Sequence, residues 1–277
     1  DPQAGVIGGA AEEFIFCGRL DNLAMSYCSL QALLDACGTT KKEGGGEREK
    51  GEREKEEVAE KRDPLENETG VMAVALFDHE EVGSDSAQGA GGPVMRDTIT
   101  RVSRALGDVE EGVVERAMLN SFLVSADMAH ALHPNYADRH DPDHQPKMHA
   151  GLVVKNNVNQ RYATNSASAV LFREVGRRAG LPCQEFSVRN DVPCGSTIGP
   201  ILASKLGCRT VDVGIAQLSM HSIREMCGTD DVAIAYEHFC AFFRGMSKLD
   251  RDAEKEFLPP FRPRGVISDD KPCCQLH

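Results

Sequence analysis

The sequence lacks the features that would mark a membrane or secreted protein. Its 277 residues contain no run approaching the roughly 20 apolar residues that a transmembrane helix needs. They also contain no basic, apolar and small-residue pattern of the kind that forms a signal peptide. From these two absences we expect a cytoplasmic protein that has no membrane partner.

Positive charge is also scarce. The chain has 31 Lys and Arg residues against 43 Asp and Glu residues, so its formal net charge is −12. This surplus of negative charge would repel a phosphate backbone, and we therefore expect no nucleic-acid partner. The ten cysteines include no CxxC pair, and in a chain of this length we expect reduced thiols rather than a disulfide scaffold.

The composition is that of a globular protein with one charged insertion. Hydrophobic residues make up 41% of the chain, enough for the core of a single α/β domain over residues 1–277. Residues 41–63 are almost all charged residues and glycine, which predicts a disordered surface insertion near residues 40–66. Because the chain begins at Asp1 rather than at a methionine, we expect that the N-terminal part of the domain is missing.

Short apolar runs alternate with helical patterns along the rest of the chain. Residues 71–77, VMAVALF, are typical of a strand covered on both faces, and residues 121–127 and 209–217 have the same character. Strands that alternate with helices predict a mainly parallel, mixed sheet flanked by helices. The expected helices span residues 22–37, 166–178, 197–205 and 231–246.

The first of these helices is predicted to be buried on one face. Leu23, Tyr27, Leu30 and Leu34 recur at helical spacing, and Gly38 ends the pattern.

Acidic and histidine side chains stand at the ends of the predicted strands. Glu80 and Glu81 follow the first run, Asp127 ends the second, His221 follows the third, and Asp21 precedes the first helix. In such sheets the ligand site lies beyond the carboxyl ends of the strands. Carboxylates that converge there repel one another unless a cation is bound, and mixed Asp, Glu and His ligation suits zinc or a similar divalent ion.

The two adjacent glutamates are expected to have different tasks. On an extended chain, neighbouring side chains point in opposite directions, so one glutamate could bind metal while the other faces the bound water as a general base. If one carboxylate bridged two ions, the site would be that of a two-metal hydrolase. The alternative interpretation is an acidic loop exposed to solvent.

Six motifs occur in order along the chain: RLDNL at 19–23, DHEEVGSDSAQGA at 78–90, SADMAHALHPNY at 125–136, VKNNVNQRYATN at 154–165, RNDVPCGSTIGPILASKLG at 189–207 and QLSMHSIREM at 217–226. Together they resemble the aspartyl aminopeptidases, a family of dinuclear zinc exopeptidases. The resemblance covers nearly the whole chain apart from the charged insertion and the ends. It implies a three-layer sandwich of the zinc-exopeptidase type and a metallo-aminopeptidase that removes N-terminal Asp or Glu from unblocked peptides.

The resemblance implies a role for each residue of the expected metal site. Asp21 resembles the carboxylate that bridges two divalent ions, expected to be Zn²⁺, while Glu81, Asp127 and His221 are similar to further ligands. Glu80 resembles the general base. In the wider clan the peptide bond after the bridging aspartate is often cis, and we expect the same between Asp21 and the residue that follows it.

A specificity pocket and an assembly are also implied. Lys155 resembles the residue that pairs with the acidic side chain of the substrate, and a partly desolvated ammonium favours a carboxylate partner. His130 and Tyr162 look like its companions, and Glu80 and Asp127 are expected to contact the substrate too. The family forms large homo-oligomers, with a dodecamer as its form.

Several alternatives stay open at this point. The family has a further metal-binding histidine upstream of the bridging aspartate and an inserted dimerisation domain, and these 277 residues contain neither. A non-catalytic subunit or scaffold is therefore one alternative, and a related metal-dependent deacylase is another. A cysteine protease built on Cys194 is a third, although the sequence ties no histidine to that thiol. The Pro- and Asp-rich loop histidines His133, His140, His144 and His149 are not expected to bind the metals.

Overall fold

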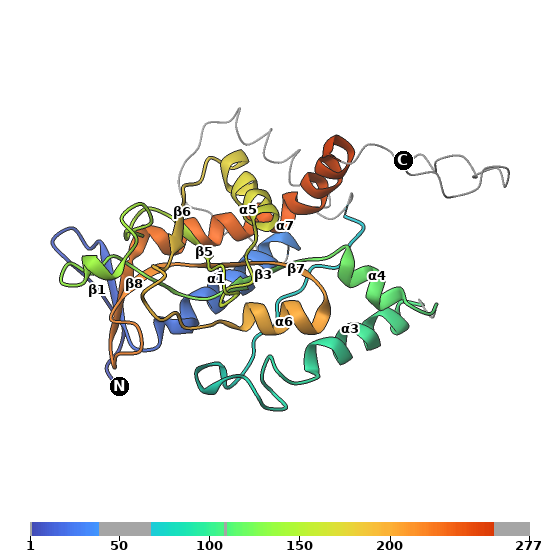
Figure 1. Ribbon diagram of the computed structural model, residues 1–277, viewed down its shortest axis with the longest axis horizontal. Helices are drawn as coiled ribbons and strands as arrows, with labels where there is room; N and C mark the ends of the chain where they lie inside the picture. The colour runs from blue at the N-terminus through green and yellow to red at the C-terminus, as the bar shows by residue number, and fades with distance from the viewer. Residues whose placement is uncertain (1, 39–67, 108–109, 258–277) are drawn as a thin grey trace, which may run out of the picture.

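The computed structural model describes residues 2–38, 68–107 and 110–257, which Figure 1 draws in colour. The charged insertion expected near residues 40–66 lies outside the described residues. Strands and helices alternate through the described ranges, and the predicted α/β fold, with sheets flanked by helices, is confirmed. The extent of the domain stays a prediction.

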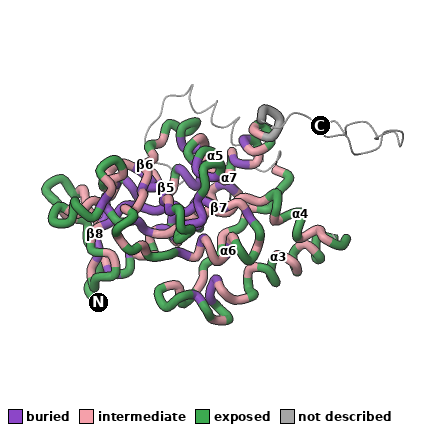
Figure 2. The backbone as a smooth tube through the Cα atoms, in the orientation of Figure 1, coloured by how far each residue is buried: buried purple, intermediate pink, exposed green. Residues whose placement is uncertain are grey.

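A four-stranded sheet forms the scaffold beneath the site. Its strands lie in the order β3 (Phe122–Ala126), β7 (Arg209–Gly214), β5 (Leu152–Asn156) and β6 (Cys183–Ser187). β3 and β7 are parallel, as are β5 and β6, whereas β5 and β7 are antiparallel. The sheet is therefore mixed, and its two central strands are the most deeply buried (Figure 2).

Helices cover both faces of this sheet (Figure 1). On one face, α1 (Leu20–Ala36), α5 (Ser166–Arg178) and α7 (Thr229–Phe257) pack together over the main hydrophobic core. α6 (Ile198–Leu206) lies on the other face. Three of the four predicted helices match these bounds to within two residues at each end, and α7 is longer than expected at its carboxyl end.

The alternation of side chains along β7 shows how the two faces differ. Val211 and Val213 are fully buried in the main core, on the side of α1, α5 and α7. Asp212 stands between them and points to the opposite face, where a Cβ on Gly199 of α6 would collide with its carboxylate. One face of β7 thus packs into the core, and the other face forms a buried polar contact.

A second, five-stranded sheet was not predicted. It contains β1 (Val6–Gly8), β2 (Phe14–Cys17), β9 (Glu225–Gly228), β8 (Ala216–Leu218) and β4 (Ala129–His130), in that order. The strand predicted at 209–217 is divided between the two sheets, because β7 ends at Gly214 and β8 begins two residues later. The remaining elements are η1 (Glu80–Val82), α3 (Val94–Ala105), α4 (Val113–Leu119) and η2 (Ala137–Arg139).

The strand predicted at residues 71–77 is wrong. This segment has no strand pairing, and its side chains are exposed or half-buried, with Val71 74% exposed. An apolar run forms a buried strand only where a neighbouring strand and two covering layers are available. In the described part of the chain, no strand pairs with residues 71–77.

The buried face predicted for α1 is also wrong. Leu23 is 60% and Tyr27 61% exposed, and Leu30 is exposed too. The helix instead buries a different face in the main core, where α1 packs against α7. The residues of α1 that are buried are Leu20, Met25, Cys28, Ala32 and Ala36.

Two further findings concern the whole described structure. The described helices include none that combines the length and the apolar character needed to cross a membrane. Eight cysteines lie in the described ranges, and all of them are free thiols, in agreement with the expectation from the sequence.

Candidate metal centre and substrate cleft

Asp21, Glu81 and His221 come together at one end of a cleft. One potential ligand atom from each of the three lies within 4.8 Å of the others. The Nε2 atom of His221 is 3.2 Å from Asp21 Oδ2 and 3.3 Å from Glu81 Oε2. Two carboxylates and one imidazole at this spacing form a donor set that suits zinc.

The turns that present these ligands have unusual backbone conformations. Arg19, His79 and His221 are non-glycine residues with φ of 62°, 63° and 65°, each within two residues of a ligand or a ligand itself. Left-handed backbone costs energy for such residues and concentrates at functional sites. The peptide bond between Asp21 and Asn22 is cis, as the resemblance implied.

Glu225 holds two of the three ligand-bearing segments together. Its carboxylate is buried and accepts hydrogen bonds from the backbone N–H of Asp21 at 2.9 Å and of His221 at 2.8 Å. One side chain on β9 therefore fixes two segments that are 200 residues apart in sequence. The sequence analysis missed Glu225, although it lies inside the last of the six motifs.

Asp127 links the metal cluster to a buried lysine. Its Oδ2 atom lies 3.2 Å from Lys155 Nζ, and its carboxylate also contacts that of Asp21. Burial, followed by the neighbouring Asp127 carboxylate, raises the pKa of Asp21 to about 8. Burial acts against ionisation of Asp127 as well, but the Lys155 ammonium together with the hydrogen bonds from Asp21, from the backbone N–H of Met128 and from Lys155 outweighs it and holds the pKa of Asp127 below its usual value.

Glu80 stands beside the cluster without belonging to it. Glu80 and Glu81 lie in the single turn of η1, so the extended conformation assumed for the pair is wrong. A 3₁₀ turn has about three residues per turn, which still separates neighbouring side chains by about a third of a rotation. Burial, then the carboxylates of Asp127 and Glu81, raise the pKa of Glu80 to about 6.

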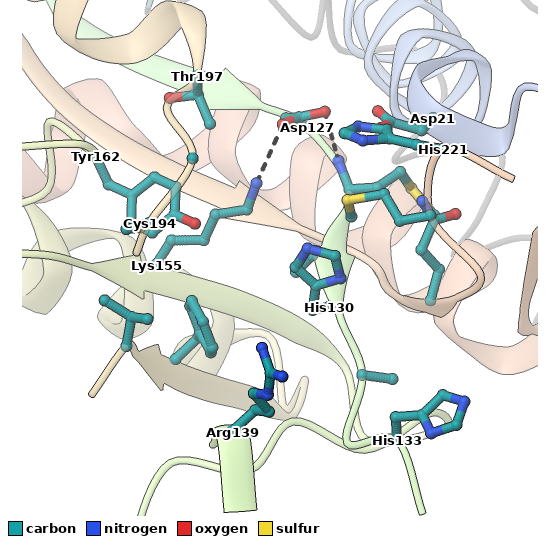
Figure 3. A pocket seen from close by; sticks show the side chains of 18 of the residues that line it. Asp21, Asp127, His130, His133, Arg139, Lys155, Tyr162, Cys194, Thr197 and His221 are labelled. Atoms are coloured by element: carbon teal, nitrogen blue, oxygen red, sulfur yellow. Dashed lines mark hydrogen bonds and ion pairs between the residues drawn. The ribbon is translucent and has the colours of Figure 1, made fainter. Parts of the chain in front are cut away.

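Lys155 lines the same cleft on the far side of Asp127 from Asp21 and His221, and its ammonium points toward Asp127 (Figure 3). Its side chain is 4% exposed, and Nζ lies 5.4 Å from the centre of the Tyr162 ring. Loss of solvation, followed by the Lys155 charge, lowers the pKa of His130. Burial and the adjacent Cys194 thiol raise the pKa of Tyr162. The structure thus brings Lys155, His130 and Tyr162 into one cleft.

A second buried carboxylate supports the wall of this pocket. Asp212 accepts hydrogen bonds from Thr197 Oγ1 and from the backbone N–H of Ala163, both at 2.6 Å. Thr197 is also the N-cap of α6, and Ala163 follows Tyr162 directly. Asp212 therefore joins the two loops that flank Lys155. The sequence offered a signal for it, an aspartate between two valines of an apolar strand.

The cleft itself has a volume of about 670 Å³ and extends well beyond the metal cluster. His133 and His140 line it far from the three ligands, and His144 and His149 pair with Asp141 and Asp230 elsewhere. Among the described residues, the one group of three potential metal ligands contains none of these four histidines.

The site combines a donor set that suits zinc with a buried lysine in one cleft, an arrangement that suits the class of metal-dependent hydrolases. More specifically, the family model described as aminopeptidase I zinc metalloprotease (M18) matches residues 1–48 and 55–243, and the chain belongs to this family.

Curated relatives agree with this assignment. A protein of Ricinus communis named probable aspartyl aminopeptidase is 59% identical over 250 residues, which are 90% of this chain and 46% of that protein. The aspartyl aminopeptidase of Dictyostelium discoideum is 43% identical over 90% of this chain and 48% of its own length. The chain spans about half the length of the curated relatives it matches.

Solved structures show the same similarity. A chain in the cryo-EM structure of the Ape4 and Nbr1 complex has a TM-score of 0.80 and 43% identity, over 91% of this chain and 43% of that one. A chain of the S. cerevisiae mApe1 dodecamer has a TM-score of 0.74 and 31% identity, over 92% of this chain and 51% of that one.

Proposed function

We propose that the chain provides the catalytic site of a metallo-aminopeptidase that removes N-terminal Asp or Glu from unblocked peptides. The observation that supports this most strongly is the placement of a buried ammonium, Lys155, in the same cleft as the Asp21, Glu81 and His221 cluster. A desolvated lysine binds a carboxylate more strongly than an exposed one does. The cleft therefore offers an acidic side chain a partner close to the hydrolytic centre.

Asp21, Glu81 and His221 would hold one zinc ion, and Asp21 and Asp127 would contribute to a second. Metal at such a site polarises a carbonyl and lowers the pKa of bound water. The described residues contain one group of three potential ligands, so the first site fits zinc better than the second. The proposed dinuclear centre would need further ligands beside Asp127.

Glu80 is proposed as the general base. It stands next to the ligand Glu81 and lines the same cleft, so it can accept a proton from the attacking water and return it to the leaving amine. Glu80 and Asp127 are also proposed to hold the α-amino group of the substrate. An enzyme that binds this group acts only at chain ends.

Lys155, His130 and Tyr162 are proposed to select the acidic side chain. The lysine has three N–H donors and uses one on Asp127, which leaves donors for a substrate carboxylate. The lowered pKa of His130 keeps this imidazole neutral beside the ammonium. Tyr162 closes the pocket with its ring face toward Lys155.

The chain is further proposed to act within a homo-oligomer in the cytoplasm. The related mApe1 structure is a dodecamer by its description, and it resembles this chain closely.

Release of free Asp or Glu from short unblocked peptides by the whole protein is the test. We expect a chelator to abolish the release and added zinc to restore it. If the protein binds no metal and releases no amino acid, the alternative of a non-catalytic subunit or scaffold would be favoured. Release that does not depend on a free α-amine would favour the deacylase.

A further inference from the structure

The ionisable side chains that line the cleft are separated by the sign of their charge. The acidic ones among the described residues all lie at the metal cluster or next to it, and they are Asp21, Glu80, Glu81 and Asp127. The far part of the cleft is lined by three basic residues, His133, Arg139 and His140. Figure 3 shows Arg139 and His133 on the opposite side of His130 from Asp127. We call these three basic residues the outer subsite.

Arg139 carries the permanent charge of the outer subsite and is available to an anion. None of the described carboxylates forms an ion pair with it, and its Cζ atom lies 5.9 Å from the centre of the Tyr136 ring. Its guanidinium points from the backbone toward His130 (Figure 3). Arg189 differs, because its guanidinium is held by Asp191 through two hydrogen bonds of 2.9 and 2.7 Å. The planar fork of donors on Arg139 is therefore free for a carboxylate, the anion whose shape it matches.

The loop that carries the outer subsite is held in place at several points. The N–H of Leu132 donates to the carbonyl of Pro146 at 2.7 Å, which closes the loop. Arg189 Nη1 donates to the carbonyl of Asp138 at 2.8 Å, and His140 forms an isolated antiparallel bridge with Val188. The two neighbours of Arg139 in sequence are thus both anchored. A binding residue on a fixed loop loses less conformational entropy when the ligand binds.

His140 adds a buried imidazole to the outer subsite. It is 8% exposed, and its ring centre lies 6.1 Å from that of Phe186. Its Nδ1 atom is buried and has no hydrogen-bond partner among the described residues. Most buried polar atoms are hydrogen-bonded, so an unpartnered ring nitrogen on a residue that lines a cleft indicates a ligand. Burial lowers the pKa of His140, and the neutral ring can donate one hydrogen bond.

We propose that the outer subsite binds a second carboxylate of the substrate, one that lies after the scissile bond, with Arg139 as its main partner. The subsite rests on the proposed function, in which Lys155 holds the first acidic side chain and the metal end holds the α-amino group. The part of the peptide that remains for Arg139 is therefore the part that leaves. Its carboxylate has two sources, the side chain of the second residue and the carboxyl terminus of a dipeptide.

The binding of three dipeptides to the whole protein with Glu80→Gln tests the outer subsite. The probes are Asp-Asp-amide, Asp-Ala with a free carboxyl terminus, and Asp-Ala-amide, which has no second carboxylate. We expect calorimetry to give one or both of the first two a dissociation constant about 3- to 10-fold lower than that of Asp-Ala-amide. The probe that gains identifies the source of the carboxylate. Equal dissociation constants for all three would overturn the proposal.

Arg139→Gln, added to the same protein, should remove this gain. Arg139 is exposed, so we expect the variant to fold normally. The matched control is Arg101→Gln, on an exposed position of α3 outside the cleft, which should keep the gain. An equal loss on all three probes would show that Arg139 holds the first side chain instead. An equal gain for a carboxylate placed five residues further along, lost in about 0.5 M salt, would assign long-range attraction. Either result would overturn the proposal.

The proposed function is tested apart from the subsite by the protein without substitutions. If it releases Asp from all three dipeptides with equal kcat/KM, the proposed function stands and the outer subsite is wrong. If it releases none, the proposed function fails, and the dissociation constants measured with Glu80→Gln still decide whether Arg139 binds a second carboxylate.

Discussion

The two ends of the cleft are anchored by similar residues that act in different ways. At the metal end, buried Glu225 binds the backbone of two residues that themselves reach the metal site, Asp21 and His221. At the pocket end, buried Asp212 binds the loops that surround Lys155 but not the lysine itself. One anchor thus acts on the reactive residues, and the other acts on the wall around them.

This difference shows that a side chain can be exposed to solvent while its backbone is held in one position. His221 is 62% exposed, yet its backbone is fixed by a carboxylate that is 2% exposed. Lys155 is itself buried on a central strand and needs less support. Reactive side chains can therefore face solvent where a buried partner holds their backbone, because the hydrogen bonds lie in a low-dielectric interior.

The largest effect should come from Glu80, which stands between the two ends. Glu80→Gln removes the proposed base but keeps its size, so we expect kcat to fall by about 10²- to 10⁴-fold on every substrate. Zinc content, measured by elemental analysis, should stay unchanged because Glu80 is not a ligand in the cluster. Glu115→Gln, on the surface of α4, is the control. Full activity of Glu80→Gln would exclude the proposed base.

Lys155→Met tests the pocket end alone. Loss of a charge-assisted hydrogen bond should cost acidic peptides about 10- to 100-fold in kcat/KM. Peptides that begin with a neutral residue should be affected much less, since their side chains cannot use the ammonium. The matched control is Lys147→Met, an exposed lysine outside the cleft. Equal losses on acidic and neutral peptides would show that Lys155 serves the metal end through Asp127 instead.

The two anchors can be compared directly by exchanging each carboxylate for its amide. Glu225→Gln should weaken zinc binding by about 10- to 100-fold, because the amide cannot accept both backbone N–H groups as well as the carboxylate does. Asp212→Asn should leave zinc affinity within about twofold and should instead lower the temperature of unfolding. Titration calorimetry with zinc and thermal denaturation measure the two effects. Similar zinc affinities in both variants would remove the distinction between the anchors.

Much of this arrangement could be read from the sequence. Asp21, Glu80, Glu81, Asp127 and His221 were placed at one sheet edge because strand ends in an α/β fold converge there, and the structure brings all five into one cleft. The residue that holds the backbone of these side chains could not be predicted from the sequence. Glu225 acts through two backbone N–H groups that sequence spacing does not connect.

The errors in the sequence analysis share one physical origin. The run at 71–77 and the stripe of Leu23 and Tyr27 on α1 were assigned to buried surfaces from their apolar pattern alone. Periodicity reports which residues suit burial, but it does not report whether a partner is present to bury them. Residues 73–77 and Leu23 line one cavity beside β3, an edge strand that pairs only with β7 among the described strands.

The smallest predicted effect concerns His238, which lies in the core away from both ends of the cleft. Burial lowers its pKa from 6.5 to about 4, and Nε2 contacts the carbonyl oxygen of Phe172. The folded state therefore keeps His238 neutral, whereas the unfolded chain binds a proton below about pH 6.5. The stabilising contribution is present above that pH and is lost as the pH falls toward 4.

Because of this group, we expect the free energy of unfolding to fall by about 1 kcal/mol when the pH is lowered from about 7 to about 5.5. Urea titrations at the two pH values measure the loss. His238→Gln keeps a donor for the carbonyl of Phe172 but cannot be protonated, so its stability should change less over the same interval. An unchanged pH dependence in His238→Gln would assign the loss to other groups. The carboxylates of the cleft would then be the next groups to test, because their neighbours differ between its two ends.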